Sequence, residues 1–525
     1  MSRLSRLAAA LGVVCLLTSC ANTVSGTPAP PRMEQRGPVG AVPAGLERFY
    51  GQPLGWTSCQ GYATTPEQKT LFRKPQLECA RVTVPLDYGK PQGETITLAL
   101  LRRPATDPAR RVGSLLVNPG GPGGSGTEAA ASFASRMTGE LGQRFDLVGF
   151  DPRGVGLSEP PVRCLTDQER DAERLDLDLD PSPEGVAQTE AEEKAYAQKC
   201  AERMGKDFLA NVGTREVVKD MDVLRSALGD AKLNYVGFSY GTRIGTAYAE
   251  AFPGNVRAMV LDGAVAPTED LVAQSIGQAK GFTAAFEAFA AWCVARENCA
   301  LGKDAKEAEK KLNAMVAPLK KEPLAVGDRK LSYSDVGTAV AQAMYSKDLW
   351  PMLDTGLTEL AAGKGRALLV LADAYLGRGA DGRYSPQNDA FRAIRCVDDP
   401  PVTDRAVVLE RARKIREAVG ERNVLDGDDE PVGALDACAF WPVPPTSQPH
   451  QPKVDGLPTT LVISTTGDPA TPHQAGVDLA KALNARLLTF EGNQHTAFLQ
   501  ENRCVDAAGA EYLVNLRLPA EGARC

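Results

Sequence analysis

The sequence predicts an α/β fold in which an open, mostly parallel sheet is interrupted by a large helical insertion. Three observations lead to this prediction: short apolar runs bounded by turn residues, amphipathic helices between them, and a long middle region where strand patterns nearly vanish. The 525 residues, 43% of them hydrophobic, suffice for one large domain or two medium ones. We expect one domain with helices on both faces of its sheet.

The strand signals fall in two regions, from about residue 81 to 265 and from about 458 to the end. Each is a short, mostly apolar run of the kind found in strands buried on both faces. The runs are Ile96–Leu101, Ser114–Asn118, Phe145–Phe150, Leu233–Gly237, Ala258–Leu261, Thr460–Ser464 and Arg486–Phe490. Helical patterns separate them, as expected for repeated β-α units.

The middle region is rich in Ala, Glu, Lys and Leu, as in Ala284–Ala295 and Lys303–Ala317. This composition favours helices. We therefore predict a helical lid over residues 267–456, flanked by the two parts of the core at 46–266 and 457–525.

The N-terminal residues predict export. Two arginines precede the apolar segment Leu7–Leu17, which is too short to span a hydrocarbon core of ~30 Å. The segment ends in Leu-Thr-Ser-Cys20, similar to a bacterial lipobox, so we predict a signal peptide over 1–19 and a lipid on Cys20; ordinary signal-peptidase cleavage nearby is the alternative. Residues 20–45, rich in Pro and Gly, should form an extended tether. The expected location is the extracytoplasmic side of the cell membrane or the cell envelope.

Twelve cysteines are many for a reducing compartment. Without Cys20 and the cysteine of the signal segment an even set remains, which in an exported protein implies disulfides. The set is Cys59, Cys79, Cys164, Cys200, Cys293, Cys299, Cys396, Cys438, Cys504 and Cys525. Sequence does not fix the connectivity, but we expect neighbours along the chain to pair, with none in a core strand. Zinc is the alternative, and the absence of any C-x-x-C makes a metal site an unfavoured interpretation.

The net charge of the chain limits the kinds of molecule that it is expected to bind. With 59 basic and 66 acidic residues the formal charge is −7, which argues against a nucleic-acid partner. The acidic stretch Asp167–Asp180 is interpreted as a solvated face. Only three histidines occur, His450, His473 and His495, and we expect neither a metal nor a cofactor.

The strongest chemical signal is Gly237-Phe-Ser239-Tyr-Gly241. This G-x-S-x-G pentapeptide is common by chance, but here it follows a predicted strand and precedes a predicted helix, residues 242–251. That context is what a nucleophile elbow requires, because the two glycines let the backbone turn sharply and expose the serine. The sequence therefore predicts a nucleophilic Ser239.

A serine hydroxyl needs a base, and the base needs an acid that orients it. His495 lies just beyond the last predicted strand, whereas the other two histidines fall in a proline-rich loop and at a helix start. Asp468 ends the strand before it, so the order Ser, Asp, His matches the pattern of α/β-hydrolases. Asp262, which also ends a strand, is the alternative acid.

The oxyanion of a tetrahedral intermediate needs backbone donors. The elbow supplies the N–H of Tyr240, and the glycine-rich segment Asn118–Gly126 supplies a second, for which we favour Gly121. The same segment satisfies G-x-G-x-x-G, a dinucleotide fingerprint. Pro119 and Pro122 remove donors and an exported protein meets little NAD, so the oxyanion interpretation is preferred; a phosphate-binding P-loop lacks its lysine.

Together these residues resemble the actinobacterial exported tripeptidyl-aminopeptidase and proline-iminopeptidase-like α/β-hydrolases. The motifs that carry the resemblance are Asn118–Gly126, Phe145–Gly154, Gly237–Thr242, Thr465–Pro472, Arg392–Asp398 and Phe440–Pro449. The resemblance covers nearly the whole mature chain. It implies a triad of Ser239, Asp468 and His495, with Thr471 as a supporting residue.

The resemblance also implies activity on peptides and short esters. Proline iminopeptidases carry a histidine where this chain has Pro119, so strict proline specificity is not expected. An aminopeptidase needs a carboxylate that holds the free α-amine, and Asp398 is a candidate for it or an ordinary loop aspartate. The leading hypothesis is a membrane-anchored serine hydrolase of aminopeptidase type, with peptides, proteins or esters as substrates. An esterase or lipase acting on envelope lipids and a non-catalytic binding lipoprotein are the alternatives.

Overall fold

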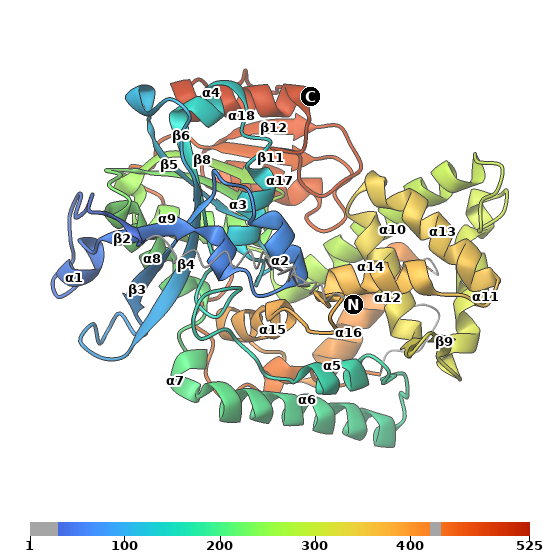
Figure 1. Ribbon diagram of the computed structural model, residues 1–525. Helices are drawn as coiled ribbons and strands as arrows, with labels where there is room; N and C mark the ends of the chain where they lie inside the picture. The colour runs from blue at the N-terminus through green and yellow to red at the C-terminus, as the bar shows by residue number, and fades with distance from the viewer. Residues whose placement is uncertain (1–29, 421–431) are drawn as a thin grey trace, which may run out of the picture.

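The computed structural model describes residues 30–420 and 432–525 (Figure 1). The signal peptide predicted over 1–19 and the lipidation predicted at Cys20 lie outside the described residues. Within the described ranges, no helix combines the length and the hydropathy needed to cross a membrane.

A ten-stranded sheet with the order β1-β2-β3-β4-β6-β5-β7-β8-β11-β12 forms the centre of the molecule. Pairing is antiparallel from β1 to β6 along this order and parallel from β6 to β12. The strands are β1 (Arg32–Glu34), β2 (Leu54–Ser58), β3 (Glu78–Pro85), β4 (Thr95–Arg103), β5 (Gly113–Asn118), β6 (Phe145–Phe150), β7 (Leu233–Phe238), β8 (Val256–Asp262), β11 (Leu461–Thr465) and β12 (Arg486–Phe490). Every predicted strand is present, and the α/β prediction is confirmed.

Helices cover both faces of the sheet, and a separate buried apolar cluster lies beneath each layer. One layer contains α1 (Glu47–Tyr50), α8 (Thr214–Ala227), α9 (Tyr240–Ala251) and α17 (His473–Ala482). The other contains α2 (Pro66–Leu71), α3 (Gly126–Phe133), α4 (Gly139–Arg144) and α18 (Arg503–Asn515). The carboxyl ends of the parallel strands therefore open between two packed layers, where side chains on the connecting loops can meet.

Between β8 and β11 the chain forms a helical segment with a buried cluster of its own. We call it the insertion; its bounds, 267–456, remain those predicted from sequence. Figure 1 shows its yellow and orange helices beside the sheet. The elements are α10 (Leu271–Val294), α11 (Ala308–Val316), β9 (Leu324–Val326), β10 (Arg329–Leu331), α12 (Tyr333–Met344), α13 (Trp350–Ala361), α14 (Arg366–Leu376), α15 (Gln387–Asp398) and α16 (Arg405–Val419).

The predicted tether extends too far along the chain. From Arg32 the backbone pairs with β2 as the edge of the sheet, and Val39 N–H donates to the Ser226 hydroxyl at 2.9 Å. Charged side chains secure this polar edge, since Glu34 lies 2.7 Å from the buried guanidinium of Arg102. Because backbone bonds and ion pairs hold this edge without an apolar pattern, the composition of the segment indicated a tether rather than a strand.

All ten predicted cysteines form disulfides between neighbours along the chain, as expected. The pairs are Cys59–Cys79, Cys164–Cys200, Cys293–Cys299, Cys396–Cys438 and Cys504–Cys525. The expectation that none lies in a core strand is wrong. Cys79 belongs to β3 and is 1% exposed. Its partner, Cys59, lies directly after β2, the strand that pairs with β3.

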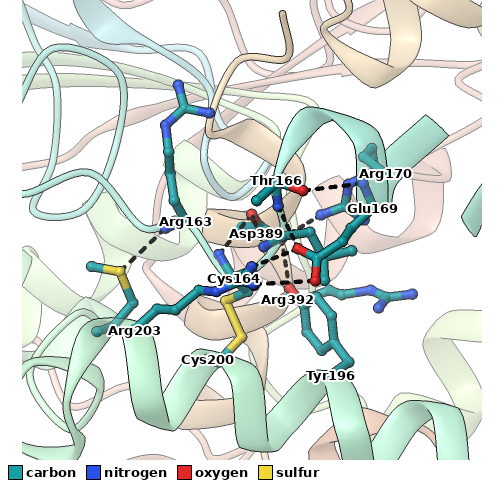
Figure 2. Close-up of a disulfide and its surroundings, with 12 residues drawn as sticks. Arg163, Cys164, Thr166, Glu169, Arg170, Tyr196, Cys200, Arg203, Asp389 and Arg392 are labelled. Carbon is teal, nitrogen blue, oxygen red and sulfur yellow. Dashed lines mark hydrogen bonds and ion pairs between the residues drawn. A yellow bond between two sulfur atoms is a disulfide. The ribbon is translucent and has the colours of Figure 1, made fainter. Parts of the chain in front are cut away.

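The acidic stretch is solvated only in part: Asp176, Asp178 and Asp180 are exposed, whereas Arg170 and Arg174 within it are buried. It begins a segment of three helices, α5 (Asp167–Glu173), α6 (Pro183–Met204) and α7 (Lys206–Leu209). Figure 2 shows Asp389, from α15 of the insertion, beside residues of α5 and α6. Its carboxylate accepts from Cys164 N–H at 2.9 Å and Tyr196 OH at 2.9 Å, and pairs with Arg170. These bonds anchor the insertion to the core segment that the second disulfide closes.

Candidate active site

Ser239 lies in the sharp turn between β7 and α9. Its φ of 55° is in the left-handed region, a strained conformation for a residue with a side chain. The turn is tight: a Cβ on Gly237 would lie 2.3 Å from Gly241 O, so this position excludes larger residues. Ser239 N–H donates to Asp262 O at 2.9 Å. The local sequence thus builds a nucleophile elbow that leaves the serine half-buried at the carboxyl end of the sheet.

His495 and Asp468 meet at the same end of the sheet. The imidazole Nδ1 lies 2.9 Å from each oxygen of Asp468, whose side chain is 0% exposed. Burial disfavours the imidazolium, but the adjacent carboxylate outweighs burial and raises the pKa of His495. The ring also lies near the elbow. Gly263 follows Asp262, whose carbonyl accepts from Ser239 N–H, and a Cβ on Gly263 would lie 3.2 Å from His495 Cε1.

Thr471 contacts both the acid and the histidine. Its N–H donates to Asp468 Oδ1 at 2.8 Å, beside a second bond of 2.9 Å from Ala470 N–H. Its hydroxyl lies 3.3 Å from His495 Nδ1. The backbone bonds fix the rotamer of the carboxylate, so the structure places Thr471 where a supporting residue would stand.

The glycine-rich loop packs against the elbow. A Cβ on Gly120 would lie 2.9 Å from Ser239 Cβ and 2.8 Å from Tyr240 N. Gly120 N–H is taken by Asn118 Oδ1 at 2.9 Å. Among the described residues, Gly121 N–H and Tyr240 N–H donate to no protein acceptor, and Gly121 is exposed. The loop therefore brings two open donors beside Ser239, which is an arrangement suited to an oxyanion.

Comparison with known proteins shows the family. A family model described as alpha/beta hydrolase fold matches residues 113–354, and one described as TAP-like protein matches residues 429–525. Serine protease Hip1 of Mycobacterium tuberculosis is 46% identical over 497 residues, which cover 93% of this chain and 94% of the relative. The chain belongs to the α/β-hydrolase family.

Two further relatives define the branch of the family. Carboxylesterase B of Mycobacterium tuberculosis is 46% identical, with 90% of this chain and 89% of the relative covered. Tripeptidyl aminopeptidase of Streptomyces lividans is 31% identical, with 90% and 86% covered. The resemblance found in the sequence is confirmed, and the chain is a serine hydrolase.

Asp398 of this hydrolase does not face a substrate. It is 0% exposed, and its oxygens accept from Thr214 N–H at 2.8 Å, Thr214 OH at 2.6 Å and Tyr240 OH. A group that holds an α-amine needs lone pairs open to the substrate, whereas this carboxylate is buried and already accepts from three protein donors. The role predicted for Asp398 is corrected accordingly: it ties α15 to the start of α8 and to the residue after Ser239.

Sequence reasoning missed Tyr345, which follows α12 in the insertion. Its carbonyl accepts from His495 N–H at 3.0 Å, and the two rings meet edge to face with centroids 5.4 Å apart. Every residue has a carbonyl, so no local signal marked this contact. His450 is exposed and bonded to Glu250, and His473 begins α17, as the sequence suggested.

Proposed function

We propose that this hydrolase works through an acyl-enzyme on Ser239, with His495 as general base and Asp468 as the acid that orients it. The observation that carries the proposal is the position of His495 Nδ1, 2.9 Å from both oxygens of a buried carboxylate. A proton held on Nδ1 leaves Nε2 as the acceptor for the serine hydroxyl. The elbow and the open donors of Gly121 and Tyr240 support the same assignment.

The reaction then has two halves. Ser239 Oγ attacks the acyl carbon while His495 Nε2 takes its proton, and the N–H groups of Gly121 and Tyr240 stabilise the oxyanion. The imidazolium gives that proton to the leaving amine or alcohol, which departs and leaves an ester on Ser239. A water molecule, deprotonated by His495, hydrolyses this ester and restores the enzyme.

Peptides and esters are the substrates that the relatives' names support. We infer that the enzyme is an aminopeptidase-type peptidase that removes tripeptides, and that the insertion is a lid that limits substrate length. The contact of α15 with the glycine loop supports a lid, since a Cβ on Gly123 would lie 2.7 Å from Gln387 O. Ester cleavage is a second activity that the same triad performs, and the carboxylesterase relative favours it.

Labelling with an active-site fluorophosphonate tests the nucleophile. We expect labelling of the wild type and of Ser135→Ala, which alters an exposed serine, and none of Ser239→Ala. Label retained in Ser239→Ala would refute the assignment, and lack of label in the wild type would favour a non-catalytic lipoprotein.

Matched substrates test the specificity. We expect free tripeptide anilides to be cleaved at least tenfold faster than N-acetylated ones, because an aminopeptidase recognises the α-amine. Equal rates would leave an endopeptidase, and p-nitrophenyl esters cleaved while every anilide resists would leave an esterase.

The enzyme is proposed to be exported and lipid-anchored at the cell membrane. The lipobox-like Cys20 and the disulfides support this location, because disulfides persist in oxidising compartments. Metabolic labelling with an alkyne fatty acid should mark the wild type and not Cys20→Ala, and the variant should leave the membrane fraction. Unchanged membrane association would refute the anchor.

A further inference from the structure

The loop that carries His495 has an unusual backbone. Thr496 and Leu499 have φ values of 64° and 57°, in a region that side chains disfavour. The loop is nevertheless enclosed, since residues 496–499 are at most 5% exposed. Such a conformation persists only where surrounding groups hold it.

Carboxylates hold this loop through its N–H groups. Asp262, the last residue of β8, accepts from Ala497 N–H at 2.8 Å and from Phe498 N–H at 2.7 Å, both on Oδ2. Asp506 accepts from Leu499 N–H at 2.7 Å. Asp262 thus binds the part of the loop nearer to His495, and Asp506 binds the part farther from it.

Asp262 also contacts the other catalytic segment. Its carbonyl accepts from Ser239 N–H at 2.9 Å, and its backbone pairs with β7 and β11 on either side. One rigid strand end therefore bonds to the nucleophile through its carbonyl and to the histidine loop through its carboxylate.

The Asp262 carboxylate is buried, and only one of its two oxygens is hydrogen-bonded to described residues. It is 0% exposed, and its Oδ1 has no hydrogen-bond partner among the described residues. Burial raises the pKa of Asp262 to about 7, and the Asp468 carboxylate adds to this rise while His495 opposes it. A buried polar oxygen without a partner is costly, and the two N–H groups that bond to Oδ2 offset part of that cost.

We propose that Asp262 is a positioning residue of this hydrolase: its carboxylate fixes the loop that carries His495 relative to the backbone of Ser239. In the sequence analysis Asp262 is the alternative acid for the histidine. Asp468 is the carboxylate that contacts His495 Nδ1, and Asp262 acts instead through the backbone of the loop. The inference rests on the proposed roles of Ser239 and His495.

Three substitutions separate geometry from charge. Asp262→Asn keeps an oxygen that can accept both N–H groups and removes the charge. Asp262→Glu keeps the charge but moves it by one methylene, and Asp262→Ala removes the acceptor. Asp506→Ala is the matched control, because it removes a cap from the same loop farther from the histidine.

The readouts are kcat and KM on a p-nitrophenyl ester, the rate of fluorophosphonate labelling, and the thermal midpoint. Misplacing a catalytic group by ~1 Å costs about 100-fold, so we expect kcat and the labelling rate to fall roughly 10- to 100-fold in Asp262→Glu and Asp262→Ala, with KM within about twofold. Asp262→Asn should stay within about fivefold of wild type, and Asp506→Ala should lower the midpoint while kcat is retained.

Wild-type kcat in Asp262→Glu, or an Asp262→Asn variant as slow as Asp262→Glu, would overturn the positioning role. If Asp262→Ala does not fold, the comparison of Asp262→Asn with Asp262→Glu is sufficient to test the positioning role. Failure of the proposed function is distinguishable, because it would appear as label retained in Ser239→Ala whatever happens at Asp262.

Discussion

Replacing Gly120 by alanine tests whether the glycine-rich loop is held against the nucleophile. The added Cβ would lie 2.4 Å from Phe238 O and 2.8 Å from Tyr240 N, whereas ordinary contacts are 3.4–4 Å. Both neighbours are backbone atoms of the elbow and cannot rotate away. The loop must therefore retreat by about 1 Å, and Gly121 N–H would retreat with it, which should cost roughly 100-fold in kcat.

Gly139 provides a matched control. It also has a positive φ, 57°, but nothing lies within 4 Å of a Cβ placed there. Gly139→Ala therefore bears only the backbone strain, about 1–2 kcal/mol of stability. The assay is kcat on a p-nitrophenyl ester together with denaturant unfolding. We expect a large loss of kcat in Gly120→Ala and none in Gly139→Ala; equal kcat values in the two variants would show that crowding at the elbow does not govern the oxyanion donors.

Three further outcomes are expected. Because the Asp468 carboxylate raises the pKa of His495, and the base must be neutral to accept a proton, Asp468→Asn should shift the acidic limb of the kcat/KM profile to lower pH and reduce kcat by about 10⁴-fold; an unmoved limb would contradict the assignment. Thr471→Val removes the hydroxyl near His495 and keeps the backbone bonds, so kcat should fall about 3- to 10-fold and recover in Thr471→Ser, measured with the same ester. Asp398→Asn places an amide among three donors and should lower the thermal midpoint while the ratio of free to N-acetylated peptide cleavage stays unchanged; a changed ratio would return Asp398 to the substrate site.

Much of the catalytic centre was accessible from sequence because its signals are local. The pentapeptide around Ser239 sits between a buried strand and a helix, and chain order pointed to Asp468 and His495, which the structure brings into contact. The strands from β4 to β12 in the main sheet were equally visible, since residues buried on both faces leave continuous apolar runs. The antiparallel edge strands β1, β2 and β3 were missed because polar or partly exposed residues interrupt them, and backbone bonds hold them in the sheet.

The errors concern contacts between distant segments. Asp398 was a candidate for binding an amine because sequence gives a charge but not the donors that surround it. Composition is incomplete in the same way for the acidic stretch, whose aspartates at 176, 178 and 180 are exposed as expected. Arg170 and Arg174 within it are nevertheless 7% and 8% exposed and bind carboxylates of the insertion.

The bond from His495 N–H to Tyr345 O makes the insertion part of the frame that supports catalysis. A cover that lifted away as one hinged body would remove this acceptor and leave the backbone of the base unpaired whenever the enzyme was open. An opening of the insertion that left Tyr345 in place would keep this acceptor on His495 N–H, whereas one that moved Tyr345 would leave that N–H without it. The end of α12 is therefore the part of the insertion whose position is tied to the histidine loop.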